Sequence, residues 1–294
     1  SRNVIEPGVV WGPGQIMDDG CLGARACLDA VKPAWDAAVA AGNPVGMGLG
    51  LKNSGLGNGA NEVSRSTVRF DPDGTIEVRH CWTEMGQGIH TVARQVAVEE
   101  LGVEPDRIKV VVDTTRELGA GQTTGSRGTV MGAGSVADAC RNAMAGGCEE
   151  GVEYEGVYVV DWTNSINDGL ENPVIHSTFG YAAQLVELDQ ETGEITKVVA
   201  AHDVGRAVNP LLCEGQIEGA VHMGLGYALT EGFPCDEHGK PRNETLRSLD
   251  IIRPKDMPPT EVILVESPDP NSPYGIKGVG EIGLVPTAGA VAAA

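Results

Sequence analysis

The segment around which the chain is organised runs from Tyr274 to Thr287 and reads Y-G-I-K-G-V-G-E-I-G-L-V-P-T. Its single carboxylate, Glu281, lies between glycines that allow tight or positive-φ backbone, and Pro286 predicts the first turn of a helix directly afterwards. Glu281 is therefore a candidate general base, whose pKa would rise if Ile282 and Leu284 excluded water from it. The alternative is a glutamate that only complements the dipole at a helix N-terminus.

The composition indicates a globular protein of about two domains. The 294 residues are 41% hydrophobic and contain no apolar run long enough to cross a bilayer. Forty-one acidic residues against 21 basic ones give a net charge of −20, which repels nucleic acid and anionic lipid. We therefore expect neither a nucleic acid nor a membrane among the partners.

The cysteines and histidines show no pattern typical of a metal site. The seven cysteines form no C-x-x-C pair, and their odd number favours reduced thiols in a reducing compartment such as the cytoplasm. The six histidines form no H-E-x-x-H pattern, so neither a zinc nor a haem site is predicted. The 41 glycines, with only 4% aromatic residues, favour close approaches of main chain, as a large buried cofactor would need.

A hairpin followed by a Gly/Gln loop and a helix is predicted twice along the chain. This repeat predicts an α+β fold of two related subdomains, residues 1–164 and 165–294, each made of hairpins in a mixed sheet packed with helices. The alternative is chance, because a hairpin followed by a helix is a common arrangement. Helices are predicted over residues 21–41 (interrupted at Pro33), 91–101, 130–147 and 215–230; hairpins over 66–81 and 182–202; and strands over 108–113, 157–162 and 261–266, with 46–59 a strand or loop.

Three loops precede predicted helices: Gly86-Gln87-Gly88, Gly125-Ser126-Arg127-Gly128 and Gly215-Gln216. Free N–H groups and the helix dipole favour a phosphate or another electron-rich group there, and a Gln amide matches the edge of a pterin or nucleobase. None of the loops fits the Rossmann or P-loop pattern. Each loop alone is better explained as a helix cap than as a ligand site, but together with Glu281 the three loops favour one cofactor cleft.

The motifs at 83–88, 123–128, 203–205, 209–220 and 275–281, in this order and spacing, resemble the successive signatures of the molybdenum hydroxylases. This is the xanthine oxidase and aldehyde oxidoreductase family. Within it, the chain is most similar to bacterial aldehyde oxidoreductases that use molybdopterin cytosine dinucleotide. The resemblance covers nearly the whole chain.

This resemblance implies roles for particular residues. Glu281 matches the catalytic glutamate, which acts as the base when an aldehyde is oxidised to a carboxylic acid with water as the oxygen source. Gln87 and Gln216 match glutamines around the metal and the pterin, with Gly86 and Gly88 flanking the first. Gly125, Ser126, Arg127 and Gly128 match main chain that wraps the cofactor. Molybdenum is held by the cofactor's dithiolene, so no protein ligand to the metal is expected.

Two features of the family have no counterpart in this sequence: a cysteine-rich region for [2Fe-2S] clusters and a Gly/Phe loop over the metal. The chain is therefore expected to be the C-terminal part of a molybdenum domain, inactive alone, with the N-terminal remainder of the same polypeptide as its partner in a homodimer. The choice of an aldehyde substrate rests on overall similarity. The alternatives are a purine or N-heterocycle hydroxylase of the same family and a non-catalytic cofactor-binding or scaffold subunit.

Overall fold

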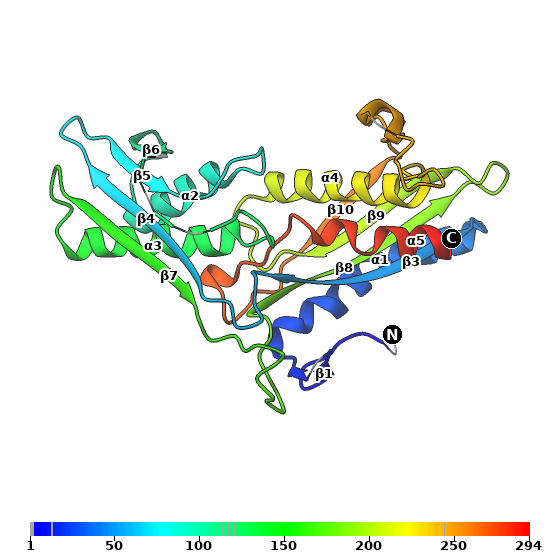
Figure 1. Cartoon of the computed structure of the whole chain (residues 1–294), viewed down its shortest axis with the longest axis horizontal. Helices are drawn as coiled ribbons and strands as arrows, with labels where there is room; N and C mark the ends of the chain where they lie inside the picture. Colours follow the sequence, from blue (N-terminus) through cyan, green and yellow to red (C-terminus); the bar gives the residue numbers. More distant parts are fainter. Residues whose placement is uncertain (1–2, 13, 113–114, 117, 120, 244) are drawn as a thin grey trace.

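The computed structural model describes residues 3–12, 14–112, 115–116, 118–119, 121–243 and 245–294. In these residues, the strands form two four-stranded mixed sheets and one short pair, β1 (Val10–Trp11) with β2 (Gln15–Ile16). Helices pack against both four-stranded sheets, which follow one another along the long axis of the molecule (Figure 1). The predicted α+β class is confirmed.

The first sheet is built on the predicted hairpin, in which Ser66 lies opposite His80. The next strand of this sheet along the chain pairs in parallel with the second strand of the hairpin. The last strand pairs antiparallel with the first strand of the hairpin. Helices α2 (Ile89–Leu101) and α3 (Gly128–Ala145) pack together beside the sheet around an apolar core that includes Val68, Val78 and Val136. In spatial order the strands are β6 (Ile108–Val111), β5 (Ile76–His80), β4 (Glu62–Phe70) and β7 (Glu153–Val160).

The second sheet follows the same pairing plan and is covered on both faces. Alternate residues separate its two cores: Leu185 packs with α1 (Leu22–Ala41), whereas Val186 packs with α4 (Pro210–Leu229) and α5 (Thr287–Ala293). Burial on both faces explains the nearly unbroken burial of its two hairpin strands. In spatial order the strands are β10 (Thr260–Val265), β9 (Ile195–Asp203), β8 (Thr178–Leu188) and β3 (Val45–Ser54).

The two four-stranded sheets share one pairing plan, as a relation between two subdomains would require. The order β4-β5-α2-β6 recurs as β8-β9-α4-β10, and in each sheet the last strand named is parallel to its neighbour. The two sheets are not separated by a division of the chain between residues 164 and 165. Helix α1 and strand β3 precede this point in the sequence but belong to the second sheet. Ten residue pairs join β3 to β8. The partners are far apart in the sequence, so no local sequence pattern predicts their pairing.

Two local predictions need correction or limits. Helix α1 continues through Pro33, because burial of Cys27 and Val31 against the sheet outweighs the loss of one backbone hydrogen bond. Strand β6 ends at Val111, and the predicted end of this strand, Asp113, lies outside the described residues. Short 3₁₀ turns complete the chain: η1 (Asp19–Cys21), η2 (Pro105–Arg107), η3 (Leu246–Leu249), η4 (Pro254–Asp256), η5 (Pro273–Gly275) and η6 (Ile282–Leu284).

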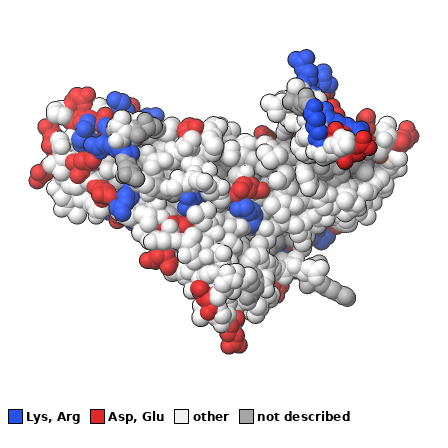
Figure 2. All heavy atoms as spheres, in the orientation of Figure 1, with Lys and Arg blue, Asp and Glu red and all other residues white. Residues whose placement is uncertain are grey.

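The surface separates charged from uncharged regions. On the visible face, acidic and basic side chains gather toward the two ends of the molecule and acidic ones also lie on its lower projection, while few lie in the middle (Figure 2). Large apolar side chains are exposed along α4 and just after it, namely Leu211, Met223, Tyr227, Leu229 and Phe233. None of the helices in the described ranges is long and apolar enough to span a membrane. Clusters of exposed apolar side chains are typical of contact surfaces.

Candidate functional site

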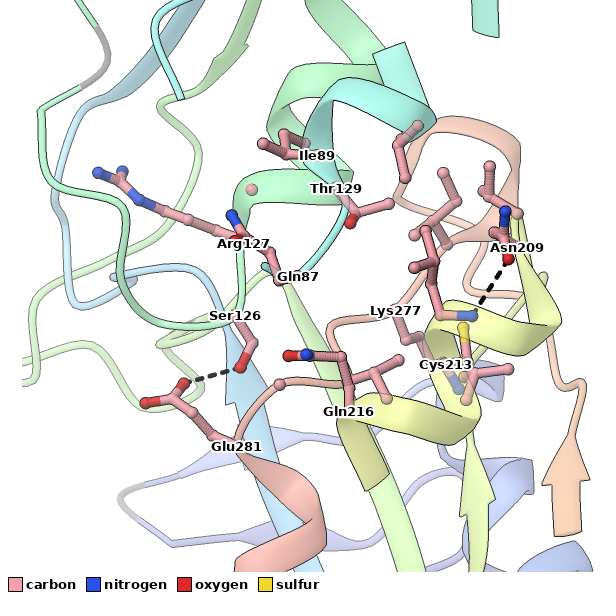
Figure 3. A pocket seen from close by; sticks show the side chains of 18 of the residues that line it. Gln87, Ile89, Ser126, Arg127, Thr129, Asn209, Cys213, Gln216, Lys277 and Glu281 are labelled. Atoms are coloured by element: carbon pink, nitrogen blue, oxygen red, sulfur yellow. Dashed lines mark hydrogen bonds between the residues drawn. The ribbon is translucent and has the colours of Figure 1, made fainter. Parts of the chain in front are cut away.

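A pocket of about 320 Å³ lies where the N-terminal ends of α2, α3 and α4 meet the segment 276–281. Gln87, Gly125, Gln216 and Glu281 all line it, although they are up to 194 positions apart in the sequence (Figure 3). The predicted convergence of the three loops with Glu281 is thereby confirmed. What these residues bind remains a prediction.

The loop before α2 satisfies most of its own donors. The Glu84 carboxylate accepts N–H hydrogen bonds from Gly86, Gly88 and His90 at 2.8, 2.9 and 3.2 Å. Burial raises the pKa of Glu84, but the three hydrogen bonds lower it by more than burial raises it. The net pKa of Glu84 therefore lies below its ordinary value. Main-chain donors that were expected to be free for a ligand are therefore held by Glu84.

Gln87 is also engaged within this loop. Its Nε2 donates to the carbonyl of Thr83 at 2.7 Å, and its Oε1 accepts from the N–H of Met85 at 2.6 Å. One N–H and one lone pair of the amide remain for a ligand. Gly86 and Gly88 have φ values of 103° and 88°, so they shape the loop through their backbone, while only Gln87 of the three lines the pocket.

The loop before α3 turns one side chain toward the pocket and another away from it. Gly125 and Ser126 both have positive φ, at 65° and 52°, and the Ser126 hydroxyl donates to Glu281 at 2.8 Å. The Arg127 guanidinium points away (Figure 3) and forms a buried ion pair with Glu62 at 2.9 Å, lying 5.3 Å from the Trp82 ring centroid. Arg127 therefore anchors the loop through its side chain, and only its main chain remains available for the predicted cofactor contact.

Gln216 lies inside α4, whereas the sequence placed it at the start of that helix. Asn209 caps the helix by accepting from the N–H of Leu212 at 3.1 Å, and Pro210 occupies the first turn. The Gln216 amide points into the pocket (Figure 3) and makes no hydrogen bond to another described residue. It is the more available of the two predicted glutamines.

Glu281 lies at the edge of the pocket with its side chain 48% exposed. Lys52 Nζ and Ser126 Oγ both approach its Oε2, each at 2.8 Å. Burial raises the pKa of Glu281, but the two hydrogen bonds and the Lys52 charge lower it more, and the net pKa lies below its ordinary value. The expected rise caused by Ile282 and Leu284 is wrong for this chain, because a cation faces the carboxylate.

Residues 52–55 were missed by the sequence analysis, although they connect the pocket's parts. Ser54 Oγ accepts the N–H of Gly278 at 2.8 Å, and the Gly55 N–H donates to the carbonyl of Gly125 at 2.8 Å. Lys52 is the one charged residue between positions 45 and 57. That isolated charge in a Gly-rich apolar strand was the available signal.

A second buried ion pair fixes the segment that leads to Glu281. Lys277 and Asp203 have fully buried side chains, and Lys277 Nζ lies 2.5 Å from the Asp203 carboxylate. Lys277 also donates to the carbonyl of Gly20, while Asp203 accepts the N–H groups of Gly205 and Ser267. These contacts join the sequence motifs at 203–205 and 275–281. Within the described ranges, no group of three or more His, Cys, Asp or Glu side chains could hold a metal ion.

Comparison with known proteins identifies the family. A family described as molybdopterin cofactor-binding domain matches residues 26–148 and 143–258, which is more than half of the chain. The aldehyde oxidoreductase of Megalodesulfovibrio gigas is 28% identical, over 87% of this chain and 31% of its own length. The nicotine 6-hydroxylase large subunit of Paenarthrobacter nicotinovorans is also 28% identical, over 87% of this chain and 38% of its own length.

The same fold occurs in the solved structure of the aldehyde oxidoreductase from Desulfovibrio gigas. The two share a TM-score of 0.80 and 24% sequence identity, over 99% of this chain and 34% of the other. The chain thus spans about a third of the length of the curated relatives it matches. It belongs to the molybdopterin cofactor-binding domain family of the aldehyde oxidoreductases and xanthine dehydrogenases.

Proposed function

We propose that this chain is the cofactor-binding catalytic region of an enzyme that oxidises aldehydes to carboxylic acids with water as the oxygen source, and that Glu281 is its general base. One observation supports this most directly. Glu281 presents an ionised carboxylate at the edge of a pocket that three sequence-distant loops line. The similarity to the M. gigas aldehyde oxidoreductase supports the aldehyde as substrate.

The pocket residues suit the molybdopterin part of a cofactor. A Cβ added to Gly280 would lie 3.5 Å from Gln216 Oε1 and 3.7 Å from Ser126 Oγ, so the glycine keeps this corner of the pocket open. The Gln216 amide offers both a donor and acceptors to a pterin edge. Main chain at Gly125 and Gly128 also lines the pocket, and the positive φ of Gly125, 65°, sets the direction of its peptide groups. We assign the cytosine dinucleotide form on family resemblance.

When bound, the molybdenum cofactor supplies a two-electron redox centre and Lewis acidity. The protein supplies proton transfer and orientation. Glu281 accepts a proton on Oε1, because Lys52 and Ser126 already occupy Oε2. Gln216 orients the ligand through its amide, and the buried pair of Lys277 and Asp203 keeps the segment before Glu281 in place.

The test replaces the carboxylate in the complete, cofactor-loaded enzyme. Glu281→Gln preserves shape but cannot take up a proton at neutral pH, so turnover of an aldehyde should fall by roughly two orders of magnitude or more. Molybdenum content and melting temperature should stay near those of the wild type. A metal-loaded Gln variant with nearly normal turnover would exclude Glu281 as the base, and would favour a non-catalytic role for the residue.

An N-heterocycle hydroxylase is the second candidate, and the similarity to a nicotine 6-hydroxylase subunit favours it. The same site chemistry serves both substrates, since each needs a base beside the redox centre. Comparing kcat/KM for a series of aldehydes with that for pyridine and purine compounds decides between them. The [2Fe-2S] clusters, a homodimer and a cytoplasmic location are proposals for the whole protein, of which this chain would form one part.

A further inference from the structure

The end of β3 holds both loops that form the Glu281 side of the pocket. Within residues 52–55, one side chain pairs with Glu281, one accepts the N–H of Gly278 and one backbone N–H donates to Gly125. These contacts span sequence separations of 70 to 229 positions. The position of the Glu281 carboxylate therefore depends on this short segment.

The hydrogen bonds to Glu281 are unequally divided between its two oxygens. Lys52 Nζ and Ser126 Oγ both contact Oε2, and no described residue donates to Oε1. Lys52 Nζ also donates to the carbonyl of Asn53 at 2.7 Å, which fixes the direction of the ammonium group. The Lys52 side chain is only 21% exposed, so solvent screens this contact less than a surface ion pair.

The other groups around Glu281 carry no charge toward it. Ser126 and Gln216 are neutral, and the following turn, η6, consists of Ile282, Gly283 and Leu284. Three other cations line the pocket, and none of them pairs with Glu281. Arg127 pairs with Glu62 and Lys277 pairs with Asp203. Arg206 forms no ion pair with Glu281. Lys52 is therefore the only cation that pairs with Glu281 in the described part of the chain.

We propose that Lys52 is a positioning residue for the reaction: it holds Glu281 as a carboxylate through Oε2 and leaves Oε1 to accept the proton. The inference rests on the proposed role of Glu281 as base. A cation at hydrogen-bond distance favours the ionised carboxylate, so removing Lys52 raises the proton affinity of Glu281. The base would then become available only at higher pH.

The experiment measures the pH dependence of kcat/KM in the complete, cofactor-loaded enzyme. In Lys52→Met the acidic limb of the kcat/KM profile should move to higher pH by about one unit. This is the lower end of the range for a carboxylate beside a cation, because the Glu281 side chain is half exposed. Lys52→Arg should restore most of the wild-type profile. The matched control is Lys197→Met. It breaks the ion pair between Lys197 and Glu261, which has a similar length of 2.6 Å but lies outside the pocket. The pH profile of this control should stay unchanged.

A second readout follows protonation of Glu281 without turnover. Infrared difference spectra against Glu281→Gln report the carboxyl C=O band, whose appearance should shift to higher pH in Lys52→Met by the same amount. If Lys52→Met loses its cofactor, the same measurements are made on Lys52→Gln, which keeps a polar end. The same shift of the pH profile and of the carboxyl band is then expected in Lys52→Gln. An unshifted profile and band would overturn the role of Lys52, whereas full activity of Glu281→Gln would instead overturn the proposed base.

Discussion

The two sheets share one pairing plan but are buried differently. In the first sheet, helices cover one face, and the other carries ion pairs such as Arg65 with Glu155 and Arg79 with Glu77. In the second, α1 covers one face while α4 and α5 cover the other. Strand β7 of the first sheet is therefore mostly exposed or half-buried, whereas β8 of the second is buried over nine consecutive residues. The same order of strands can thus be buried to different extents, depending on which faces the helices cover.

The buried ion pairs extend this comparison to the pocket. The first half contributes Arg127 with Glu62, and the second contributes Lys277 with Asp203. Each pair fixes a loop that lines the pocket, because Arg127 follows Ser126 directly and Lys277 lies four positions before Glu281. The two halves therefore use the same device, a charge pair in the interior, to hold the site between them.

The largest expected effect comes from breaking one of these pairs. Lys277→Met leaves Asp203 as a buried charge without its cation and should lower the free energy of unfolding by about 3–5 kcal/mol. The double variant Lys277→Met/Asp203→Asn, which removes the charge, should recover part of this loss. Urea unfolding of both variants measures it. A single variant as stable as the wild type would mean that the second half does not depend on its pair.

The pH dependence of stability should reflect one buried histidine in each half. Burial and, secondarily, His90 lower the pKa of His80 to about 4, and burial lowers that of His202 to about 3. As pH falls below about 6.5, the unfolded chain binds protons that these folded histidines do not, so the free energy of unfolding should decrease. Urea unfolding between about pH 7.5 and 5 tests this, and His80→Asn should show a smaller slope than the wild type. An unchanged slope would indicate that His80 does not contribute.

The smallest effect is expected on the open face of the first sheet. Arg65 and Glu155 are 43% and 55% exposed, and breaking such a pair with Arg65→Ala should cost less than about 1 kcal/mol. Thermal unfolding measures the change. A cost comparable to that of Lys277→Met would show that another part of the protein covers this face.

Local sequence patterns determined most of the secondary structure and the identity of the candidate site. Alternating residues on both sides of the turn at 71–74 and Asn209-Pro210 before a helix act within a few positions, so they are readable without a fold. The three Gly/Gln loops and Glu281 were found in the same way. Their convergence followed from the expectation that each offers donors to one ligand.

Only the tertiary structure decided the electrostatic state of the site. Glu281 was expected to have a raised pKa from its apolar neighbours, but Lys52, 229 positions away, lowers it through a contact that no local pattern encodes. The assignment of α1 and β3 to the second sheet was likewise decided by pairing with β8. Charge interactions and strand pairing depend on distance in space, whereas helix and turn signals depend on neighbours in the chain, and this is why the sequence revealed one and not the other.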